Sequence, residues 1–236
     1  MTGMTKPYVL HYAPDNASMI IRLALDELDI AFDTCLVDRA VAAQRSKGYR
    51  ALNPAGRIPT LETPDGPISE TGAILLWLAD RHGGLLPDPR DPMRAAALNW
   101  LFFLANTLHA DAAILFYINR YGVETDHAAM RDAVRARLTA HVALIETEAR
   151  PRLTGWLGAR QPSALDLYLA PLLRWLQLYP VEDRGWFDLA AYPGLHAMCI
   201  ALEQRQSTDR LCIAEGMGPH PFSAPDYPQP PEGSAL

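Results

Sequence analysis

The chain has 236 residues, of which 49% are hydrophobic, and a formal net charge of -6 at pH 7, so it can bury a sizeable core in two moderate domains. The acidic balance and the lack of a Lys/Arg block exclude the basic surface that a nucleic-acid partner requires. No stretch approaches the ~20 apolar residues of a membrane span and no signal-peptide pattern opens the chain, so we expect a cytoplasmic protein with neither nucleic-acid nor membrane partners.

The first part of the chain predicts a strand, a helix and a second strand. Residues 7–12 and 31–37 have the apolar, β-branched and aromatic character of strands. Between them, the turn cluster APDNA opens the amphipathic stretch SMIIRLALDELD, which predicts a helix. Residues 41–52 are compatible with another helix.

A hairpin and a helix follow. IPTLET and GPIS predict two strands around the turn Pro64-Asp65-Gly66, and ETGAILLWLADRH predicts a helix that ends at Gly83-Gly84. The order βαβ and then ββα indicates a small α/β unit of about eighty residues.

The rest of the chain predicts helices and a Pro-rich end. LLPDPRDP holds three prolines in eight residues, which is typical of a linker. Helical patterns follow at residues 93–120, 126–150, 163–178 and 192–204. The last nineteen residues contain six prolines and predict an extended tail on or off the surface. The predicted organisation is a first domain at 6–83, a linker at 84–92, an all-helical domain at 93–217 and a tail at 218–236.

The cysteines give no sign of a disulfide framework or a metal site. Cys35, Cys199 and Cys212 are odd in number, widely spaced and without a C-x-x-C pair. We interpret them as small apolar residues and expect no metal.

The stretch NPAGRIPTLETPDGPISETGAILLWLAD, residues 53–80, resembles the glutathione-binding half of the glutathione S-transferase family, bacterial members in particular. The family pattern is Asn-Pro-x-Gly-x-Val/Ile-Pro-x-Leu, a hairpin, and Glu-Ser/Thr at a helix start. Ser163-x-x-Asp166, a capping-box pattern, is similar to the cap of a family helix in the second half. The resemblance implies a thioredoxin-like α/β domain followed by an all-α domain.

The same resemblance implies a glutathione site. Pro59 is cis in the family, and Ile58 would pair with the cysteinyl backbone of glutathione. Thr71 and Glu70, at a helix N-terminus, would bind the γ-glutamyl carboxylate and ammonium respectively. The alternative for both is ordinary helix capping. Arg57 and Gln44 complete the predicted glutathione-binding residues. Gln44, Ser46 and Lys47 fall where the family often contacts the glycine carboxylate of glutathione, and the alternative for these three is that they are exposed polar residues of a loose helix.

The residue that activates the glutathione thiol departs from the family pattern. His11, Asp15 and Ala17 fall where members carry a tyrosine, a serine or a cysteine. The remaining catalytic candidates are Asn16, Ser18 and Tyr12, whose side chains are hydrogen-bond donors. The alternative for Asn16 is helix N-capping, that for Ser18 is N-capping or a position in the first helical turn, and that for Tyr12 is core packing.

The second-substrate pocket is predicted between the loop at 12–17 and the long helix after the linker, because ligand sites favour domain interfaces. Its candidates are Ala13, Asn99, Trp100, Phe103, His109, Phe116 and Tyr117. Packing in the core is the alternative for the aromatic members.

The resemblance implies a homodimeric transferase that takes glutathione as cosubstrate, needs no metal, and joins the thiolate to a small hydrophobic electrophile. Two alternatives stay open. One is a glutathione-dependent disulfide reductase or peroxidase, and the other is a non-catalytic protein that binds glutathione or a hydrophobic ligand.

Overall fold

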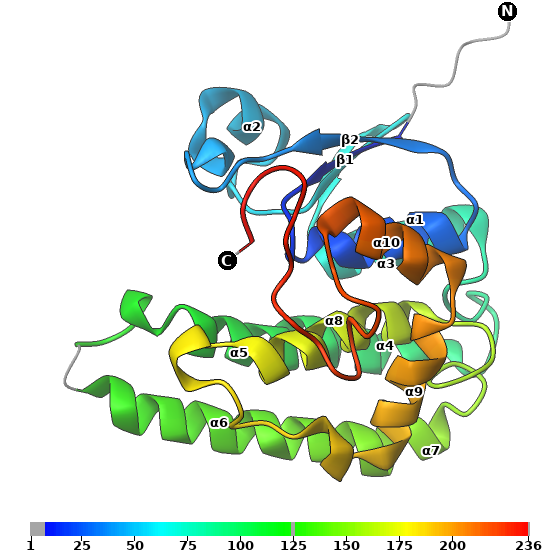
Figure 1. The fold of residues 1–236 in the computed structure, drawn as a ribbon. Coiled ribbons are helices and arrows are strands. Elements are labelled where there is room, and N and C mark those ends of the chain that lie inside the picture. Colours follow the sequence, from blue (N-terminus) through cyan, green and yellow to red (C-terminus); the bar gives the residue numbers. More distant parts are fainter. Residues whose placement is uncertain (1–7, 124–125, 236) are drawn as a thin grey trace, which may run out of the picture. The chain divides into compact units, whose positions relative to one another are not determined.

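The computed structural model describes residues 8–123 and 126–235, which fall into two compact units (Figure 1). The N-terminal unit holds residues 8–85, 204–219 and 226–235, and the helical unit holds residues 86–203 and 220–225. Residues 6, 7 and 236, at the ends of predicted segments, lie outside the described residues. The two units interleave along the chain, because the residues after 203 are divided between them.

A four-stranded mixed sheet organises the N-terminal unit. Its strands are β1 (Tyr8–Tyr12), β2 (Phe32–Leu36), β3 (Thr60–Thr63) and β4 (Gly66–Ser69). The strand order is β2-β1-β3-β4, with β1 parallel to β2 and antiparallel to β3, and β3 antiparallel to β4. The predicted thioredoxin-like half, a βαβ unit followed by a hairpin and a helix, is therefore confirmed.

The helices of this unit are α1 (Ser18–Glu27), α2 (Lys47–Leu52), α3 (Thr71–His82) and α10 (Gln206–Glu215). Helix α1 contacts both α3 and α10, and the three lie on one side of the sheet (Figure 1). The predicted helix at 41–52 is divided into a 3-10 turn and α2, because Ser46 has extended backbone and caps α2. Helix α10 has no counterpart among the predicted helices.

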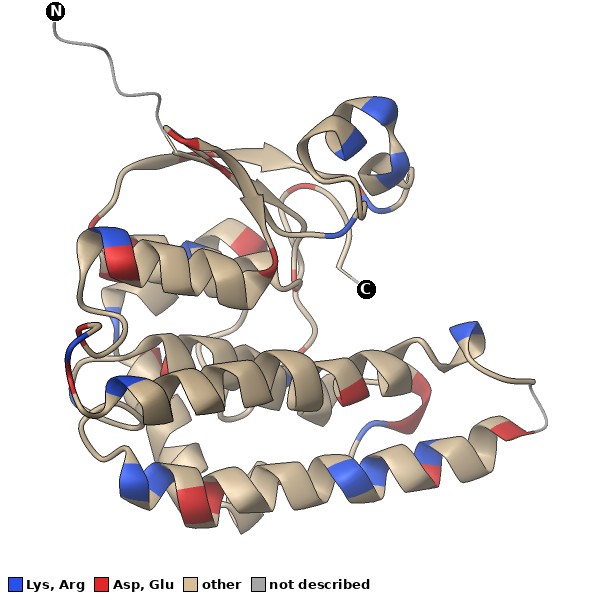
Figure 2. Cartoon of the chain, turned by 180° about the vertical axis from the view of Figure 1, so that it is seen from behind, with Lys and Arg blue, Asp and Glu red and all other residues tan. Residues whose placement is uncertain are grey.

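The helical unit contains α4 (Arg94–Phe103), α5 (His109–Phe116), α6 (His127–Leu144), α7 (Arg150–Arg152), α8 (Ala164–Leu178) and α9 (Pro193–Glu203). The predicted helices at 93–120 and 126–150 are each interrupted by a π-helical turn, at Leu104–Leu108 and Ile145–Ala149. Within α6, charged residues of both signs lie between Arg131 and Arg137 and residues 138–144 carry no Lys, Arg, Asp or Glu, whereas α4 carries few (Figure 2).

Helix α8 is the buried core of the helical unit. Its predicted capping box is confirmed, because the Ser163 hydroxyl accepts the N–H of Leu165 while the Asp166 carboxylate accepts the N–H of Ser163 at 2.7 Å. Burial raises the pKa of Asp166 to about 6.

The first part of the Pro-rich tail is packed into the helical unit. Phe222 is fully buried, and Glu203 accepts the backbone N–H groups of Phe222 and Ser223 at 2.9 and 2.7 Å. Arg174, itself fully buried, donates to the carbonyl of Pro221. The expectation of a tail on or off the surface is wrong for residues 220–225, because the Phe222 ring is buried and the side chains of Glu203 and Arg174 bind the backbone there.

The cysteines are free: Cys199 is buried, Cys212 is half-buried and Cys35 is exposed on β2. Within the described residues, no group of three or more His, Cys, Asp or Glu side chains is arranged to hold a metal ion. None of the described helices is long and apolar enough to cross a membrane.

Candidate functional site

The predicted glutathione residues meet at one edge of the sheet. His11 near the end of β1 pairs with Thr60 at the start of β3, and Thr60 pairs with Ser69 at the end of β4. The residue next to His11 is Tyr12, the residue before Thr60 is Pro59, and the residue after Ser69 is Glu70. The strand register therefore brings together three segments that are far apart in sequence.

The loop before β3 presents an unpaired backbone. The Ile58–Pro59 peptide bond is cis. The carbonyl of Arg57 accepts hydrogen bonds from the Tyr49 hydroxyl at 2.6 Å and the Asn53 amide at 2.8 Å, which fixes the loop. The N–H and C=O of Ile58 take part in no hydrogen bond among the described residues. An extended peptide can pair with such a backbone in the manner of an added strand.

Tyr49 is a positioning residue that the sequence interpretation missed. It is buried beneath the loop and also hydrogen-bonds the Thr60 hydroxyl at 3.0 Å. Burial raises the pKa of its phenol, so it remains a neutral donor. An aromatic residue in a short polar helix, just ahead of Asn53-Pro54, was the available signal.

The N-terminus of α3 borders the same edge. Glu70 precedes the helix with φ 69, a conformation that L-residues rarely adopt. Its exposed side chain makes no capping hydrogen bond, so the capping alternative is wrong for Glu70. Thr71 is buried at the first helical position, where backbone N–H groups lack partners within the helix. A positive φ at a residue other than glycine, as at Glu70, is backbone strain that is concentrated at functional sites.

The segment before α2 contributes one uncommitted polar atom. Gln44 Oε1 is buried and has no hydrogen-bond partner in the described part of the chain. Ser46, in contrast, accepts the Tyr49 N–H at 3.1 Å and is a helix cap. Lys47 and Arg57 are exposed. Gln44 is therefore the member of this group with an acceptor to offer.

The three candidates for thiol activation differ in whether their donor is already used. The Ser18 hydroxyl is fully buried and donates to the Ala13 carbonyl at 3.0 Å. The Tyr12 hydroxyl donates to the carboxylate of Glu232. The half-buried Asn16 side chain makes no hydrogen bond to any described residue. Ala17 is the N-cap of α1 and no side chain caps this helix, so N-capping is wrong for both Asn16 and Ser18. Ser18 is the first residue of α1, which agrees with the alternative of a first-turn position.

A buried charged cluster fixes the loop that carries these candidates. Asp15 is fully buried with φ 48, and its N–H donates to Glu215 of α10 at 2.9 Å. Glu215 also accepts from Arg22 Nε at 3.3 Å. Burial raises the pKa of Glu215 to about 7, although Arg22 opposes this shift. The guanidinium of Arg22 lies 4.9 Å from the centre of the Tyr12 ring. The sequence interpretation missed Arg22 and Glu215.

The second-substrate candidates of the helical unit do not share one face. Phe103 packs edge-on against His141 of α6, with ring centres 5.5 Å apart. His109 hydrogen-bonds Tyr168 of α8 through Nδ1 at 3.0 Å. Phe103 and His109 thus contact different helices.

The other candidates have varied surroundings. Trp100 packs edge-on against Phe103, and Phe116 packs against Tyr179. Tyr117 lies under the Arg120 guanidinium, and Asn99 is exposed. Ala13 is fully buried in the N-terminal unit.

Comparison with known proteins gives agreement over most of the chain. Residues 10–86 match the family model of the glutathione S-transferase N-terminal domain, and residues 128–197 match that of the C-terminal domain. The chain is 31% identical over 211 residues to maleylacetoacetate isomerase of Rhizobium meliloti, covering 84% of this chain and 94% of that protein. It is 28% identical over 218 residues to the disulfide-bond oxidoreductase YfcG of Escherichia coli, covering 89% and 96%. A glutathione transferase homologue from Sulfitobacter, solved with bound glutathione, superposes with a TM-score of 0.74 at 26% identity, covering 87% and 96%.

Proposed function

Because this chain belongs to the glutathione S-transferase family, we propose that it joins the glutathione thiolate to a small hydrophobic electrophile. The observation that carries the proposal is the unpaired backbone of Ile58, at the same sheet edge as the N-terminus of α3. A tripeptide needs both features, because its backbone seeks a strand partner and its carboxylate seeks free N–H groups.

Each part of glutathione then has a partner. The cysteinyl backbone pairs with Ile58, and the γ-glutamyl carboxylate binds Thr71 and the first-turn N–H groups of α3. The free carboxylate of Glu70 accepts the γ-glutamyl ammonium. Gln44 Oε1, an unpartnered acceptor, takes an N–H near the glycyl end, and the exposed Arg57 attracts the glycyl carboxylate.

Asn16 is the donor to the sulfur in this proposal. A free thiol has a pKa near ~8.5, so a transferase gains from any donor that favours the thiolate. The thiolate attacks the electrophilic carbon, a C–S bond forms, and the leaving group departs with the bonding electron pair. Asn16 is the candidate whose amide is uncommitted, whereas Tyr12 and Ser18 donate to protein acceptors.

The second substrate and the oligomeric state involve residues outside the glutathione site. The hydrophobic electrophile binds among members of the predicted set on α4 and α5. The active form is a homodimer. Sedimentation equilibrium of the full chain measures the oligomeric state directly.

The test combines glutathione titration calorimetry with conjugation to chlorodinitrobenzene. The wild-type chain binds glutathione and forms the conjugate, and Asn16→Ala lowers kcat/KM about tenfold or more, because a donor to developing negative charge is lost. The matched control is Asn119→Ala, which removes an exposed asparagine of the helical unit. A wild-type chain without conjugating activity contradicts the transferase function, and an unchanged Asn16→Ala rate contradicts only the role of Asn16.

Glutathione-dependent disulfide reduction is the second candidate. It is favoured by the commitment of both the Tyr12 and the Ser18 hydroxyls, and by the likeness to a disulfide-bond oxidoreductase. In this reaction two glutathione molecules reduce a disulfide to two thiols and leave as glutathione disulfide. The same preparation is assayed with hydroxyethyl disulfide and with a hydroperoxide. Tight glutathione binding without either turnover identifies a non-catalytic binding protein.

A further inference from the structure

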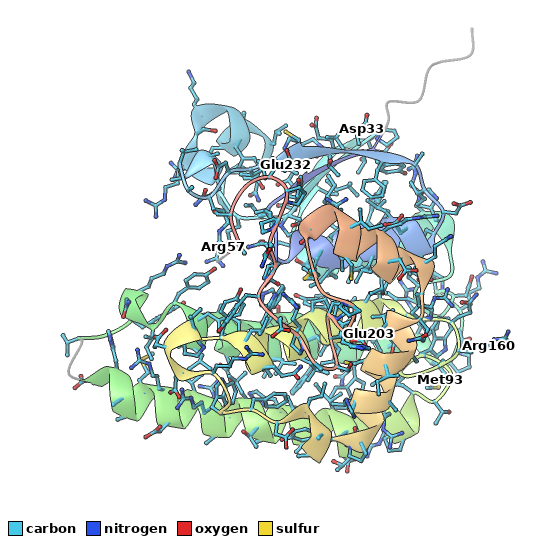
Figure 3. All side chains as sticks on the ribbon, in the orientation of Figure 1. Asp33, Arg57, Met93, Arg160, Glu203 and Glu232 are labelled. Carbon is cyan, nitrogen blue, oxygen red and sulfur yellow. The ribbon has the colours of Figure 1, made fainter. Side chains whose placement is uncertain are left out.

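The last residues of the chain lie on the predicted thiol site. Residues 226–235, here called the C-terminal strap, belong to the N-terminal unit. Glu232 accepts the hydrogen bond of the Tyr12 hydroxyl, and Figure 3 shows Glu232 and Arg57 at the same end of the sheet. Tyr12 is 3% exposed with the strap in this position.

Close backbone packing fits the strap to its place. Gly233 has φ 72, a conformation that favours glycine, and a Cβ atom there would lie 2.8 Å from Leu36 Cδ1 and 3.3 Å from Pro14 Cδ. Leu36 is the β2 partner of Tyr12 in the sheet, and Pro14 belongs to the loop of thiol-activating candidates. The strap therefore lies against β2 and against the loop that follows Tyr12.

The strap is also anchored away from its tip. Gln229 donates its N–H to the Gly216 carbonyl at 2.8 Å, and a Cβ on Gly216 would approach Gln229 O to 1.9 Å. Upstream, the bonds from Glu203 hold Phe222 and Ser223 in the helical unit. Only the run after Gln229 lies beyond these anchors, and its polar contact with the sheet is the Tyr12–Glu232 bond.

This contact opposes glutathione activation. The Tyr12 hydroxyl has a single proton, which Glu232 already accepts. Burial and this hydrogen bond raise the pKa of Tyr12, so the hydroxyl stays a neutral donor. A thiolate that enters beside Tyr12 competes with Glu232 for the proton and is repelled by its carboxylate, which raises the thiol pKa.

We propose that the C-terminal strap is an autoinhibitory gate of the glutathione site, closed by the Tyr12–Glu232 hydrogen bond and displaced by glutathione. The inference rests on the proposed function, since it assigns the gated site to glutathione. With the gate open, Tyr12 becomes a second donor to the sulfur beside Asn16. The nearby Arg22 guanidinium favours the negative charge that collects there.

The test measures glutathione affinity by calorimetry in four full-length proteins: wild type, Glu232→Ala, Tyr12→Phe and the double variant. Glu232→Ala binds glutathione about tenfold more tightly, because a hydrogen bond to a charged group no longer has to be broken. In the Tyr12→Phe background the same substitution has almost no effect, because the gate contact is already absent. Glu148→Ala, an exposed glutamate of the helical unit with its own arginine partner, leaves the affinity unchanged.

A chain that ends at Pro225 keeps the anchored residues 220–225 and removes the whole strap, and it also binds glutathione more tightly. Weaker binding by this chain or by Glu232→Ala overturns the gate and identifies a lid that retains glutathione. Equal effects of Glu232→Ala in both backgrounds overturn the role of Tyr12 in the gate. If glutathione binds none of the proteins, the proposed function fails together with the gate. If wild type binds and conjugates glutathione and all variants have the wild-type glutathione affinity, the gate is refuted and the proposed function stands.

Discussion

At the scale of single residues, the candidate site depends on unusual backbone conformations more than on reactive side chains. Asp15 and Glu70 both have positive φ, at 48 and 69, and both stand next to residues of the predicted glutathione site. Strain of this kind costs about 1–3 kcal/mol and persists where the surroundings enforce it. Glu215 enforces it at Asp15, and the end of β4 together with the start of α3 enforces it at Glu70.

Thr71→Val tests the anion-binding role of the α3 N-terminus. The substitution preserves shape and removes the hydroxyl that the proposed γ-glutamyl carboxylate uses. We expect the glutathione Kd to rise about tenfold, the equivalent of one charge-assisted hydrogen bond. Thr154→Val, at an exposed position of the helical unit, is the control and keeps the wild-type Kd. A Kd that does not change in Thr71→Val would mean that Thr71 is only a helix residue.

At the scale of elements, α10 determines the shape of the loop between β1 and α1. It ends at Glu215, which is fully buried against Arg22 of α1 and the N–H of Asp15. A helix near the C-terminus thereby supplies a hydrogen-bond acceptor to a loop near the N-terminus.

The raised pKa of Glu215 gives this arrangement a pH dependence. Burial raises the pKa of Glu215 from its ordinary 4.5 to about 7, so the folded state holds the proton more tightly than the unfolded state. The carboxyl contributes its full stability below pH ~4.5 and loses it as the pH rises through ~7. We expect wild type to lose on the order of 1–3 kcal/mol relative to Glu215→Gln between pH 5 and pH 8.

Urea unfolding of the two proteins at several pH values measures this difference. Parallel pH profiles would show that Glu215 is ionised throughout this range. In that case attraction by Arg22 and the Asp15 N–H outweighs burial.

The elements that sequence patterns predicted are those with local signals. The alternation in β1 and β2, the turn at Pro64-Asp65-Gly66 and the capping box at Ser163 each depend on neighbours in sequence. The family resemblance placed Ile58, Glu70 and Thr71 at one site, which the strand register supports.

Contacts between segments that are distant in sequence could not be predicted from such local patterns. Helix α10 has few apolar residues and no side-chain cap, so its sequence resembles a surface loop. The bond from Asp15 to Glu215 spans 200 residues, and the bond from Tyr12 to Glu232 spans 220. The alternative of N-capping by Ser18 is wrong because its hydroxyl donates to the carbonyl of Ala13, and Ala17 holds the N-cap position.

At the scale of the whole molecule, the two units exchange segments near the end of the chain. Residues 220–225 interrupt the N-terminal unit and are held in the helical unit. Glu203, which is almost fully buried, accepts two backbone N–H groups and the Ser223 hydroxyl.

Glu203→Ala tests how much this anchor stabilises the fold. Two buried N–H groups lose their acceptor, which costs about 2–4 kcal/mol. We expect the midpoint of thermal unfolding to fall by more than about 5 °C, measured by circular dichroism. Ser223→Ala removes only the hydroxyl bond and is expected to cost about 1 kcal/mol. Equal, small effects of the two substitutions would show that the anchor contributes little.

Because the residues after 203 are divided between the two units, the N-terminal unit receives its last segments only at the end of translation. The first 85 residues leave the ribosome well before residues 204–219 and 226–235, which complete their unit. Until then Arg22 and the Asp15 N–H lack Glu215, and the β1–α1 loop is without its support. The nascent chain therefore gains the support of the β1–α1 loop only after the helical unit has been translated. A product that terminates before α10 carries every predicted glutathione-binding residue and still lacks the carboxylate that binds Asp15 and Arg22.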